Sequence, residues 1–557
     1  MPNIWKLLRF RLPSRRDRHV KVAEAVARVL KEEGVEHLIC YPRQALIDFC
    51  AEIGIRPVVC RQERVGVGIA DGISRSTYGK RIGVFSMQGG PGVENTFPGA
   101  AQVFGDNVPV LLIPGDRVGR SFTPPSFDPV QTFRPVMKWA AEISEPGRVI
   151  ELMRRAFHNL RTGKPGPVLI ELPSKIGNSE MEGEFEYSPP RGIRTAPDQA
   201  DVRSIAELLL KARNPVIHAG QGVLYSGATK ELVRVAELLQ TPVLTTNTGK
   251  GAFPENHPLS LGASVVSAPK MMFHFLKKAD IVVAMGSSLT RNHWAPQIPN
   301  GKTIIHCTND AADINKEFPT KAAMLGDAKL MLEALIAEIG NKKRTSDNVA
   351  QEVHAVRQEW LNEWVPELTS SEEPINQYRI VHDLMNAVDR ENTIVTHDSG
   401  SPREQMVAFW QCLVPGGYLG WGKTTQLGHG LGLIMGAKIA NPDKLCINVM
   451  GDASIGMVGM DIETAVRNRI GILTIVFNNG VMAGEQNGLV AAVQRYQAAN
   501  LGGNYSEVAK ALGAWSTRIA KPDAFLPALK QAIEATQSGT PAVIECVAKQ
   551  NFKYSRY

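Results

Sequence analysis

One stretch of the chain, Leu445-Cys446-Ile447-Asn448-Val449-Met450-Gly451-Asp452-Ala453-Ser454, joins an apolar run to a short polar turn. The run has the length of a buried strand, and the residues after it are typical of a turn that begins a helix. A second apolar run, Leu473–Phe477, ends in a similar way at Asn478-Asn479. Parallel strands of an α/β sheet end at one edge, where ligands bind. We therefore expect Asp452 and Asn479, which are 27 positions apart, to lie together at a binding site.

Alternating strand and helix patterns continue in both directions and predict an α/β fold. Two polar linkers, Ser188–Gly192 and a longer one over 340–375 that carries an amphipathic helix, divide the pattern into three blocks. Each block can bury its own core, so we predict three doubly wound parallel-sheet domains. The predicted bounds are 1–19 for a basic N-terminal extension, then 20–187, 195–340 and 376–557 for the domains. Strands are predicted at His37–Cys40, Pro57–Cys60, Ile82–Phe85, Val108–Pro114, Pro167–Leu172, Pro215–His218, Pro242–Thr245, Ile281–Met285, Thr303–His306, Thr393–Thr396, Leu445–Met450, Ile472–Phe477 and Ala542–Val547.

The composition argues against several classes of protein. Charged residues make up 21% of the chain, an ordinary share for a globular protein. No apolar run reaches the roughly 18 residues that a membrane span needs, and no basic–aromatic repeat suggests nucleic-acid binding. Part of the net charge of +7 lies in residues 1–19. We expect an extension without a core there; a lipid-binding or targeting leader is the alternative.

The cysteines indicate the compartment. The seven of them form no C-x-x-C pair, and their neighbours are apolar. Such residues are typical of buried free thiols in a reducing compartment. In the absence of a signal peptide, we expect a cytoplasmic protein.

The residue types at the two strand ends suggest a magnesium and phosphate site. Asp452 offers a carboxylate and Asn479 an amide oxygen, and Mg²⁺ prefers a few such hard oxygens together with the oxygens of a phosphate. The N–H groups of Ala453 and Ser454 begin a predicted helix and can bind an anion. Each pair taken alone is equally typical of a plain turn; the combination and its spacing favour a site.

A second motif lies in the first block. Gln62-Glu63 precedes a helix rich in small residues over 65–74, and Gly90-Pro91-Gly92-Val93-Glu94-Asn95 follows. An isolated glutamate at a helix start ordinarily complements the helix dipole.

Together these motifs resemble the thiamine-diphosphate enzyme superfamily, and from about residue 20 to 550 the chain is similar to its acetolactate synthase group, which includes pyruvate decarboxylase and benzaldehyde lyase. The run Gly249–Leu259 resembles the central domain of this group. The resemblance implies pyrimidine-binding, central and diphosphate-binding domains, in that order. It implies that Asp452, Asn479 and the main-chain oxygen of Val481 hold Mg²⁺, and that Glu63 binds the pyrimidine nitrogen N1′ of the cofactor.

Further residues carry over from the resemblance by position. Leu427 would keep the cofactor bent, and the Thr425 carbonyl would accept from its 4′-amine. Gln44 would face the reactive thiazolium carbon, and Glu485 would move protons; for both, an ordinary loop residue is an equal alternative. Ala453 replaces a common glycine, a departure that the family tolerates. The diphosphate would contact Ser399, Gly400, Ser401, Gly451, Ala453 and Ser454.

The reaction is less well defined by the sequence. The resemblance implies decarboxylation of a 2-keto acid followed by carboligation, in a dimer or tetramer whose active sites lie at subunit interfaces. The substrate-side residues depart from acetolactate synthases at Asp116, at Ser287–Trp294, which includes Arg291, and at Ala483–Gly488, which has no tryptophan. Simple decarboxylation and 2-hydroxyacyl cleavage therefore stay open. Binding of FAD as a further cofactor also stays open, although these residues do not support it. A thiamine-binding regulatory subunit without activity is disfavoured, because binding alone does not need Glu63.

Overall fold

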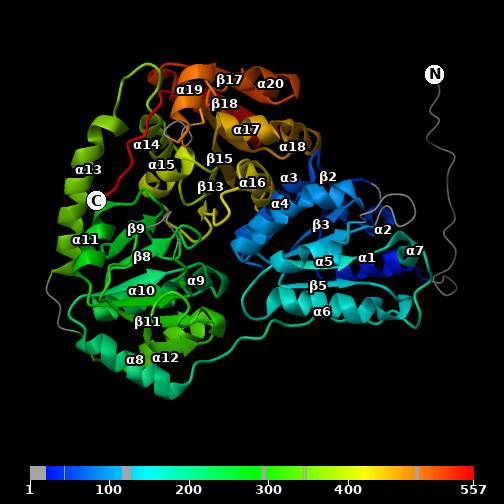
Figure 1. Ribbon diagram of the computed structural model, residues 1–557, viewed down its shortest axis with the longest axis horizontal. Helices are drawn as coiled ribbons and strands as arrows, with labels where there is room; N and C mark the ends of the chain where they lie inside the picture. Colours follow the sequence, from blue (N-terminus) through cyan, green and yellow to red (C-terminus); the bar gives the residue numbers. More distant parts are fainter. Residues whose placement is uncertain are drawn as a thin grey trace.

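The computed structural model describes residues 20–42, 44–115, 127–291, 296–342, 344, 348–482, 484 and 488–557. The predicted extension at 1–19 and the candidate residue Glu485 lie outside these ranges. Within them the chain forms three six-stranded sheets, each parallel and flanked by helices (Figure 1). The predicted α/β class with three doubly wound sheets is confirmed.

The first and third sheets have the same topology. Their strand orders are β2-β1-β3-β4-β6-β5 and β14-β13-β15-β16-β18-β17, which match position by position. The strands of the first sheet are β1 (His37–Cys40), β2 (Arg56–Val59), β3 (Gly83–Met87), β4 (Val110–Pro114), β5 (Trp139–Glu142) and β6 (Val168–Glu171). Those of the third sheet are β13 (Thr393–His397), β14 (Tyr418–Leu419), β15 (Leu445–Gly451), β16 (Leu473–Asn478), β17 (Trp515–Ile519) and β18 (Ala542–Val547).

Helices connect these strands. The first block contains α1 (Val22–Glu32), α2 (Ala45–Glu52), α3 (Glu63–Ser76), α4 (Pro91–Gly105), α5 (Pro129–Phe133), α6 (Val149–Arg161) and α7 (Ser174–Gly177). The last block contains α14 (Gln377–Ala387), α15 (Ser401–Phe409), α16 (His429–Ala440), α17 (Asp452–Val458), α18 (Ile462–Asn468), α19 (Val490–Tyr496), α20 (Tyr505–Ala511) and α21 (Phe525–Gln537).

The central sheet has a different order, β12-β11-β10-β7-β8-β9, in which the order reverses between β7 and β10. Its strands are β7 (Pro215–Ala219), β8 (Val243–Thr246), β9 (Ser260–Ser264), β10 (Ile281–Met285), β11 (Thr303–Thr308) and β12 (Thr320–Leu325). Its helices are α8 (Gln199–Lys211), α9 (Gly222–Tyr225), α10 (Thr229–Leu239), α11 (Lys270–Lys278) and α12 (Ala328–Ile339). The amphipathic helix expected in the second linker is α13 (Val349–Leu368), which runs along the side of the molecule in Figure 1.

The first and third domains meet where α3 crosses α16. A Cβ built at Gly436 would lie 1.9 Å from the carbonyl oxygen of Ile69, and one at Gly72 would lie 2.0 Å from that of Leu433. Only glycine allows two backbones to approach so closely. Apolar residues of both domains also merge in one buried cluster around the two helices. The crossing therefore fixes α3, which begins at the candidate residue Glu63, against α16, which begins just after the candidate segment.

All seven cysteines are buried free thiols, as predicted, and they are spread over the three domains. Burial raises the pKa of each thiol that is described, to about 12 for Cys40 and Cys307. Among the described residues, no helix is both long and apolar enough to cross a membrane.

Candidate active site

The predicted diphosphate and metal residues of the third domain lie at the carboxyl ends of three adjacent strands. β13 pairs with β15, and β15 pairs with β16, all in parallel. In this register Gly451 stands opposite Phe477, so the turns that follow these two strands lie side by side. This is the edge of an α/β sheet at which ligands bind.

Asp452 links two of these turns. Its Oδ1 accepts from the main-chain N of Ala453, and its Oδ2 accepts from the main-chain N of Gly480, both at 2.8 Å. The half-buried Asn479 turns its Oδ1 toward the main-chain N of Val481, at 3.2 Å. Burial raises the pKa of Asp452, against the backbone donors that lower it. The residues predicted to hold Mg²⁺ therefore belong to two turns that one buried carboxylate joins.

Asp398 is a candidate site residue that sequence reasoning missed. It is fully buried directly after β13, and four donors surround its carboxylate. The main-chain N of Ser399 and of Gly428 lie at 2.9 Å, that of Gly430 at 3.1 Å, and the hydroxyl of Ser454 at 2.7 Å. One side chain thus connects three separate predicted segments. Its place at the end of a predicted strand was the one available signal.

The space beside Asp398 fits a diphosphate group. The hydroxyl of Ser399 is buried, and no atom of the described chain pairs with it. A Cβ built at Gly400 or at Gly451 would meet no atom within 4 Å. Buried polar atoms are ordinarily hydrogen-bonded, so an unpaired hydroxyl beside open space suits a phosphate oxygen. The turn over 399–401 leads into α15, whose first N–H groups favour an anion.

The segment expected to support the cofactor rings lies next to this space. Thr425 adopts a left-handed backbone conformation with φ of 56°, and Gly428 follows with φ of 90°. Leu427 is half-buried, and the side-chain oxygen of Gln426 is buried without a partner in the described chain. The segment is thus held in an uncommon conformation and presents both apolar and polar atoms.

Glu63 lies at the first turn of α3 and is only 5% exposed. Asn95 Nδ2 donates to Glu63 Oε2 at 3.2 Å, and a Cβ built at Gly92 would lie 3.1 Å from Oε1. The two residues of the second predicted motif therefore surround the carboxyl group. Burial raises the pKa of Glu63, an effect that the hydrogen bond from Asn95 only partly offsets. A carboxyl group in this state is suited to sharing a proton with a ligand.

Gln44 is already engaged by its own domain. Its amide donates to the carbonyl of Met87 at 3.0 Å and accepts from the hydroxyl of Ser86 at 2.7 Å. These bonds fix the side chain at the carboxyl end of β3, and they leave one lone pair of its oxygen free to accept from a ligand. Glu485 and Asp116 lie outside the described residues.

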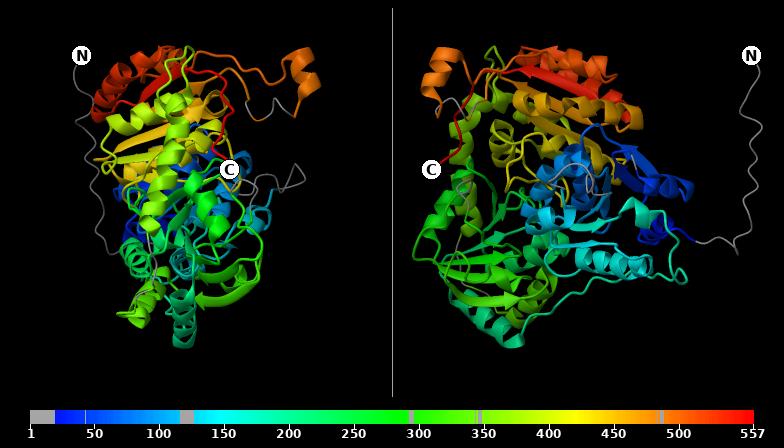
Figure 2. Two further views of the ribbon diagram at one scale, coloured as in Figure 1. Left: turned by 90° about the vertical axis from the view of Figure 1, so that its left-hand side faces the viewer. Right: turned by 45° about the vertical axis from the view of Figure 1, so that its right-hand side comes forward.

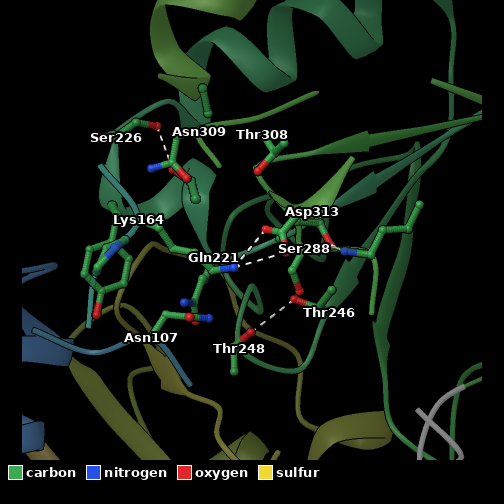
Figure 3. Close-up of a pocket in the computed structure, with 18 of the residues that line it drawn as sticks. Asn107, Lys164, Gln221, Ser226, Thr246, Thr248, Ser288, Thr308, Asn309 and Asp313 are labelled. Atoms are coloured by element: carbon green, nitrogen blue, oxygen red, sulfur yellow. Dashed lines mark hydrogen bonds and ion pairs between the residues drawn. The ribbon is translucent and has the colours of Figure 1, made fainter. Parts of the chain in front are cut away.

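A cavity of about 810 Å³ occupies the carboxyl edge of the central sheet, apart from the turns around Asp398 (Figure 3). It opens where the strand order reverses, between the ends of β7 and β10, which is the ligand position of such sheets. Four buried polar atoms on its wall have no partner in the described chain: Tyr78 Oη, Tyr225 Oη, His218 Nδ1 and Asn247 Oδ1. Arg291 lines this cavity and stacks on Phe318 at 4.5 Å. The positively charged residues of its wall are Lys80, Arg161, Lys164, Arg194, Arg291, Arg403 and Lys423.

Comparison with known families agrees with this architecture. Residues 20–125 match the thiamine pyrophosphate enzyme N-terminal TPP binding domain, 202–335 match the central domain, and 398–546 match the C-terminal TPP binding domain. The chain is 30% identical to a probable acetolactate synthase large subunit of Methanocaldococcus jannaschii, over 92% of this chain and 90% of the relative. It is 28% identical to an acetolactate synthase of Arthrospira platensis, over 88% of each, and 26% identical to the acetolactate synthase isozyme 3 large subunit of Escherichia coli, over 82% of each. With matches in all three domains and a site that suits a diphosphate, the chain belongs to the thiamine pyrophosphate enzyme family.

Proposed function

We propose that this chain is a thiamine-diphosphate- and Mg²⁺-dependent carboligase that decarboxylates a 2-keto acid and joins the remaining fragment to a second carbonyl compound. The observation that carries the proposal is the convergence on Asp398 of the turns at 399, 428–430 and 454, next to a buried serine hydroxyl without a partner in the described chain. The acetolactate synthase names of the relatives favour carboligation over simple decarboxylation.

Each candidate residue has a defined task in this proposal. Bound thiamine diphosphate supplies a nucleophilic carbon and accepts the electrons released when CO₂ leaves. Asp452, Asn479 and the main-chain oxygen of Val481 hold Mg²⁺, whose oxygen preference they match. The turns over 399–401 and 451–454 bind the diphosphate.

The residues around the rings control protons and shape. Glu63, whose pKa is raised by burial, shares a proton with pyrimidine N1′. The Thr425 carbonyl would accept from the 4′-amine, and Leu427 would lie against the rings. Gln44 and Glu485 are retained as candidates for contact with the substrate and for proton movement.

Product analysis tests the proposal. The purified chain, incubated with pyruvate, thiamine diphosphate and Mg²⁺, is expected to form acetolactate and CO₂, and removal of Mg²⁺ by a chelator is expected to abolish turnover. If acetaldehyde is the sole organic product, the activity is simple decarboxylation and not carboligation. Cleavage of a 2-hydroxyacyl compound without ligation would indicate a lyase.

Two glutamate variants make this assay specific. Glu63→Gln is expected to bind the cofactor but to turn over at least about 100-fold more slowly, since general acid–base groups contribute roughly 10²–10⁴-fold. Glu94→Gln is the control, because Glu94 is exposed and directly precedes Asn95 on the same helix. Full activity of Glu63→Gln would contradict the assignment of Glu63. A wild-type chain that binds thiamine diphosphate but turns over no keto acid would favour a regulatory subunit.

The active unit proposed is a homo-oligomer in which first and third domains of different subunits share each site. Exposed apolar residues support a further contact surface: Leu489, Val490 and Tyr496 are 44%, 55% and 80% exposed on and beside α19. This helix has no buried residue and stands clear of the rest of the chain in both views of Figure 2. It follows the turn proposed to hold Mg²⁺, so a subunit packed there would lie close to the site.

The central cavity is proposed as the place to test FAD and CoA esters. Its cationic wall and its unpaired polar atoms suit a ligand with phosphate groups. Titration of the chain with each compound, followed by calorimetry, decides whether either binds.

A further inference from the structure

Asp106 holds the segment that precedes Thr425 and Leu427, although it belongs to the first domain. It follows α4 and is fully buried. Its Oδ2 accepts from Gln102 Nε2 at 2.7 Å, from Arg75 Nη2 at 3.1 Å and from the main-chain N of Gly422 at 3.2 Å. Its Oδ1 accepts from the main-chain N of Lys423, also at 3.2 Å. Two consecutive N–H groups of the third domain thus depend on one carboxylate of the first.

The partners of Asp106 bind the same segment at two further points. Arg75 Nη1 donates to the carbonyl oxygen of Gly420 at 2.8 Å. The hydroxyl of Thr424 donates to the side-chain oxygen of Gln102. Hydrogen bonds in which one member is charged are stronger than neutral ones. The first domain therefore fixes the chain from 420 to 424 through a charged network.

The conformation of the segment explains why it needs such contacts. Gly422, Thr425 and Gly428 have φ values of 131°, 56° and 90°. A non-glycine residue in the left-handed region persists only when its surroundings determine it. Asp398 holds the far end through the N–H of Gly428, at 2.9 Å. Thr425 and Leu427 thus lie between two anchored ends, one fixed by Asp398 and the other by Asp106.

We propose that Asp106 is a positioning residue for the ring end of the cofactor: it fixes the Gly422 and Lys423 N–H groups and thereby sets where Thr425 and Leu427 face. The inference rests on the proposed function, because it takes this segment as the support of the cofactor rings. The diphosphate end has its own anchor, Asp398, within the third domain. Loss of the Asp106 carboxylate should therefore weaken binding of the rings and leave binding of the diphosphate unchanged.

Two ligands separate these effects. Asp106→Asn preserves size, but an amide accepts hydrogen bonds through only one of its two polar atoms, so one backbone N–H loses its acceptor. By calorimetry on the full chain with Mg²⁺, affinity for thiamine diphosphate is expected to fall roughly 10- to 100-fold. Affinity for inorganic pyrophosphate, which lacks the rings, is expected to stay that of the wild type.

Matched variants guard against a general loss of folding. Asp280→Asn is the control for Asp106→Asn, since the Asp280 carboxylate also accepts from backbone N–H groups, those of Arg213, Asn214 and Ile281, in the central domain. Thr424→Val removes the hydroxyl that contacts Gln102 from an exposed position, and Thr369→Val removes a comparable exposed hydroxyl directly after α13. The two controls are expected to bind both ligands as the wild type does. Thr424→Val is expected to lower the affinity for thiamine diphosphate and to leave the affinity for pyrophosphate unchanged. If Asp106→Asn does not fold, the two affinities measured for Thr424→Val test the inference in its place.

Three results would overturn the inference. Unchanged affinity for thiamine diphosphate in the Asp106→Asn and Thr424→Val variants would remove the positioning role and leave the proposed function intact. An equal loss of pyrophosphate affinity would show damage to the whole site instead of to its ring end. A wild-type chain that does not bind thiamine diphosphate would refute the proposed function and this inference together.

Discussion

Asp461 and Asp71 are buried carboxyl groups at the boundary between the first and third domains, but their pKa values move in opposite directions. Burial raises the pKa of Asp461 to about 6, although its Oδ1 accepts from the main-chain N of Arg61 at 2.8 Å. Burial acts on Asp71 too, but the Arg75 guanidinium at 2.7 Å holds its pKa down to about 2. The difference follows from the cation in direct contact with Asp71, which stabilises the ionised carboxylate against the effect of burial.

This difference predicts a pH-dependent effect of Asp461→Asn. Because the folded chain binds the Asp461 proton more tightly than the unfolded chain, the wild type loses stability as the pH rises from about 4 to 6, and the loss is complete above that. The variant lacks this titration. Its free energy of unfolding relative to the wild type is expected to increase by about 2–3 kcal/mol between pH 4 and pH 7.

Unfolding curves at the two pH values measure this change. Asp523→Asn is the control, because the Asp523 side chain is 99% exposed. A difference between Asp461→Asn and the wild type that does not vary with pH would contradict the prediction.

The candidate site also shows which residues a sequence can indicate. Asp452, Asn479 and Glu63 stand at predictable positions, at strand ends or at a helix start. Asp398 also follows a predicted strand, but neither its role nor that of Asp106 leaves a pattern in the sequence, because the two carboxylates accept from backbone N–H groups 30 and 316 positions away. Only the folded chain brings a carboxylate to those groups, so the role of neither residue was predicted.

At the scale of elements, the crossing of α3 and α16 leaves no room for a side chain. Gly436→Ala would place a methyl group 1.9 Å from the carbonyl oxygen of Ile69. Both sides of this contact are backbone, so the helices must separate, at an expected cost of about 3 kcal/mol or more. Since α16 follows Leu427, affinity for thiamine diphosphate should fall as well.

Gly456→Ala is the matched control for this variant, since it also adds a methyl group to a helix. The nearest atom to its Cβ would be the Tyr505 hydroxyl at 3.9 Å. In that open position alanine should preserve or slightly raise the thermal midpoint. Equal midpoints for the two alanine variants would show that the helices can adjust.

Strand predictions from the sequence fail at the edges of the sheets. Every interior strand was predicted, whereas β5, β9, β12, β14 and β17 were missed, and each of these is an edge strand. Interior strands of a parallel sheet are covered on both faces and are therefore continuous apolar runs. Edge strands carry polar or half-buried residues, as β5 and β17 do, and β14 is only two residues long. The pattern therefore revealed the class of the fold but not the full width of its sheets.

At the scale of the whole molecule, the third domain is packed against both others. One buried cluster joins it to the first domain, and a second joins it to the central domain and to α13. The helix expected in a linker therefore belongs to the core: Trp360 stacks on Phe409 with ring centres 4.9 Å apart. Neither cluster could be predicted from patterns that treat each block separately.

The proposed sharing of sites between subunits predicts complementation. Glu63→Gln and Asp452→Ala chains are each expected to be inactive alone. If each site combines Glu63 of one subunit with Asp452 of another, a mixed dimer has one site with both changes and one with neither, and about half of the wild-type activity per dimer is expected.

Coexpression with two different affinity tags and purification through both isolates the mixed species for assay. Mixed dimers of the wild type with Glu63→Gln provide the reference for a single intact site. Activity no higher than that of the parent variants would show that each site is formed by one chain.

The distribution of the buried cysteines has a practical consequence. Cys40, Cys50 and Cys60 lie in the first domain, Cys307 in the central one, and Cys412, Cys446 and Cys546 in the third. A thiol reagent reacts with the thiolate of an accessible cysteine. Each buried cysteine is therefore expected to stay unmodified until the region around it unfolds. Brief alkylation during denaturation, followed by mass spectrometry of the peptides, would record the order in which the three regions come apart. The natural chain already contains the labels for this experiment, and no engineered probe is needed.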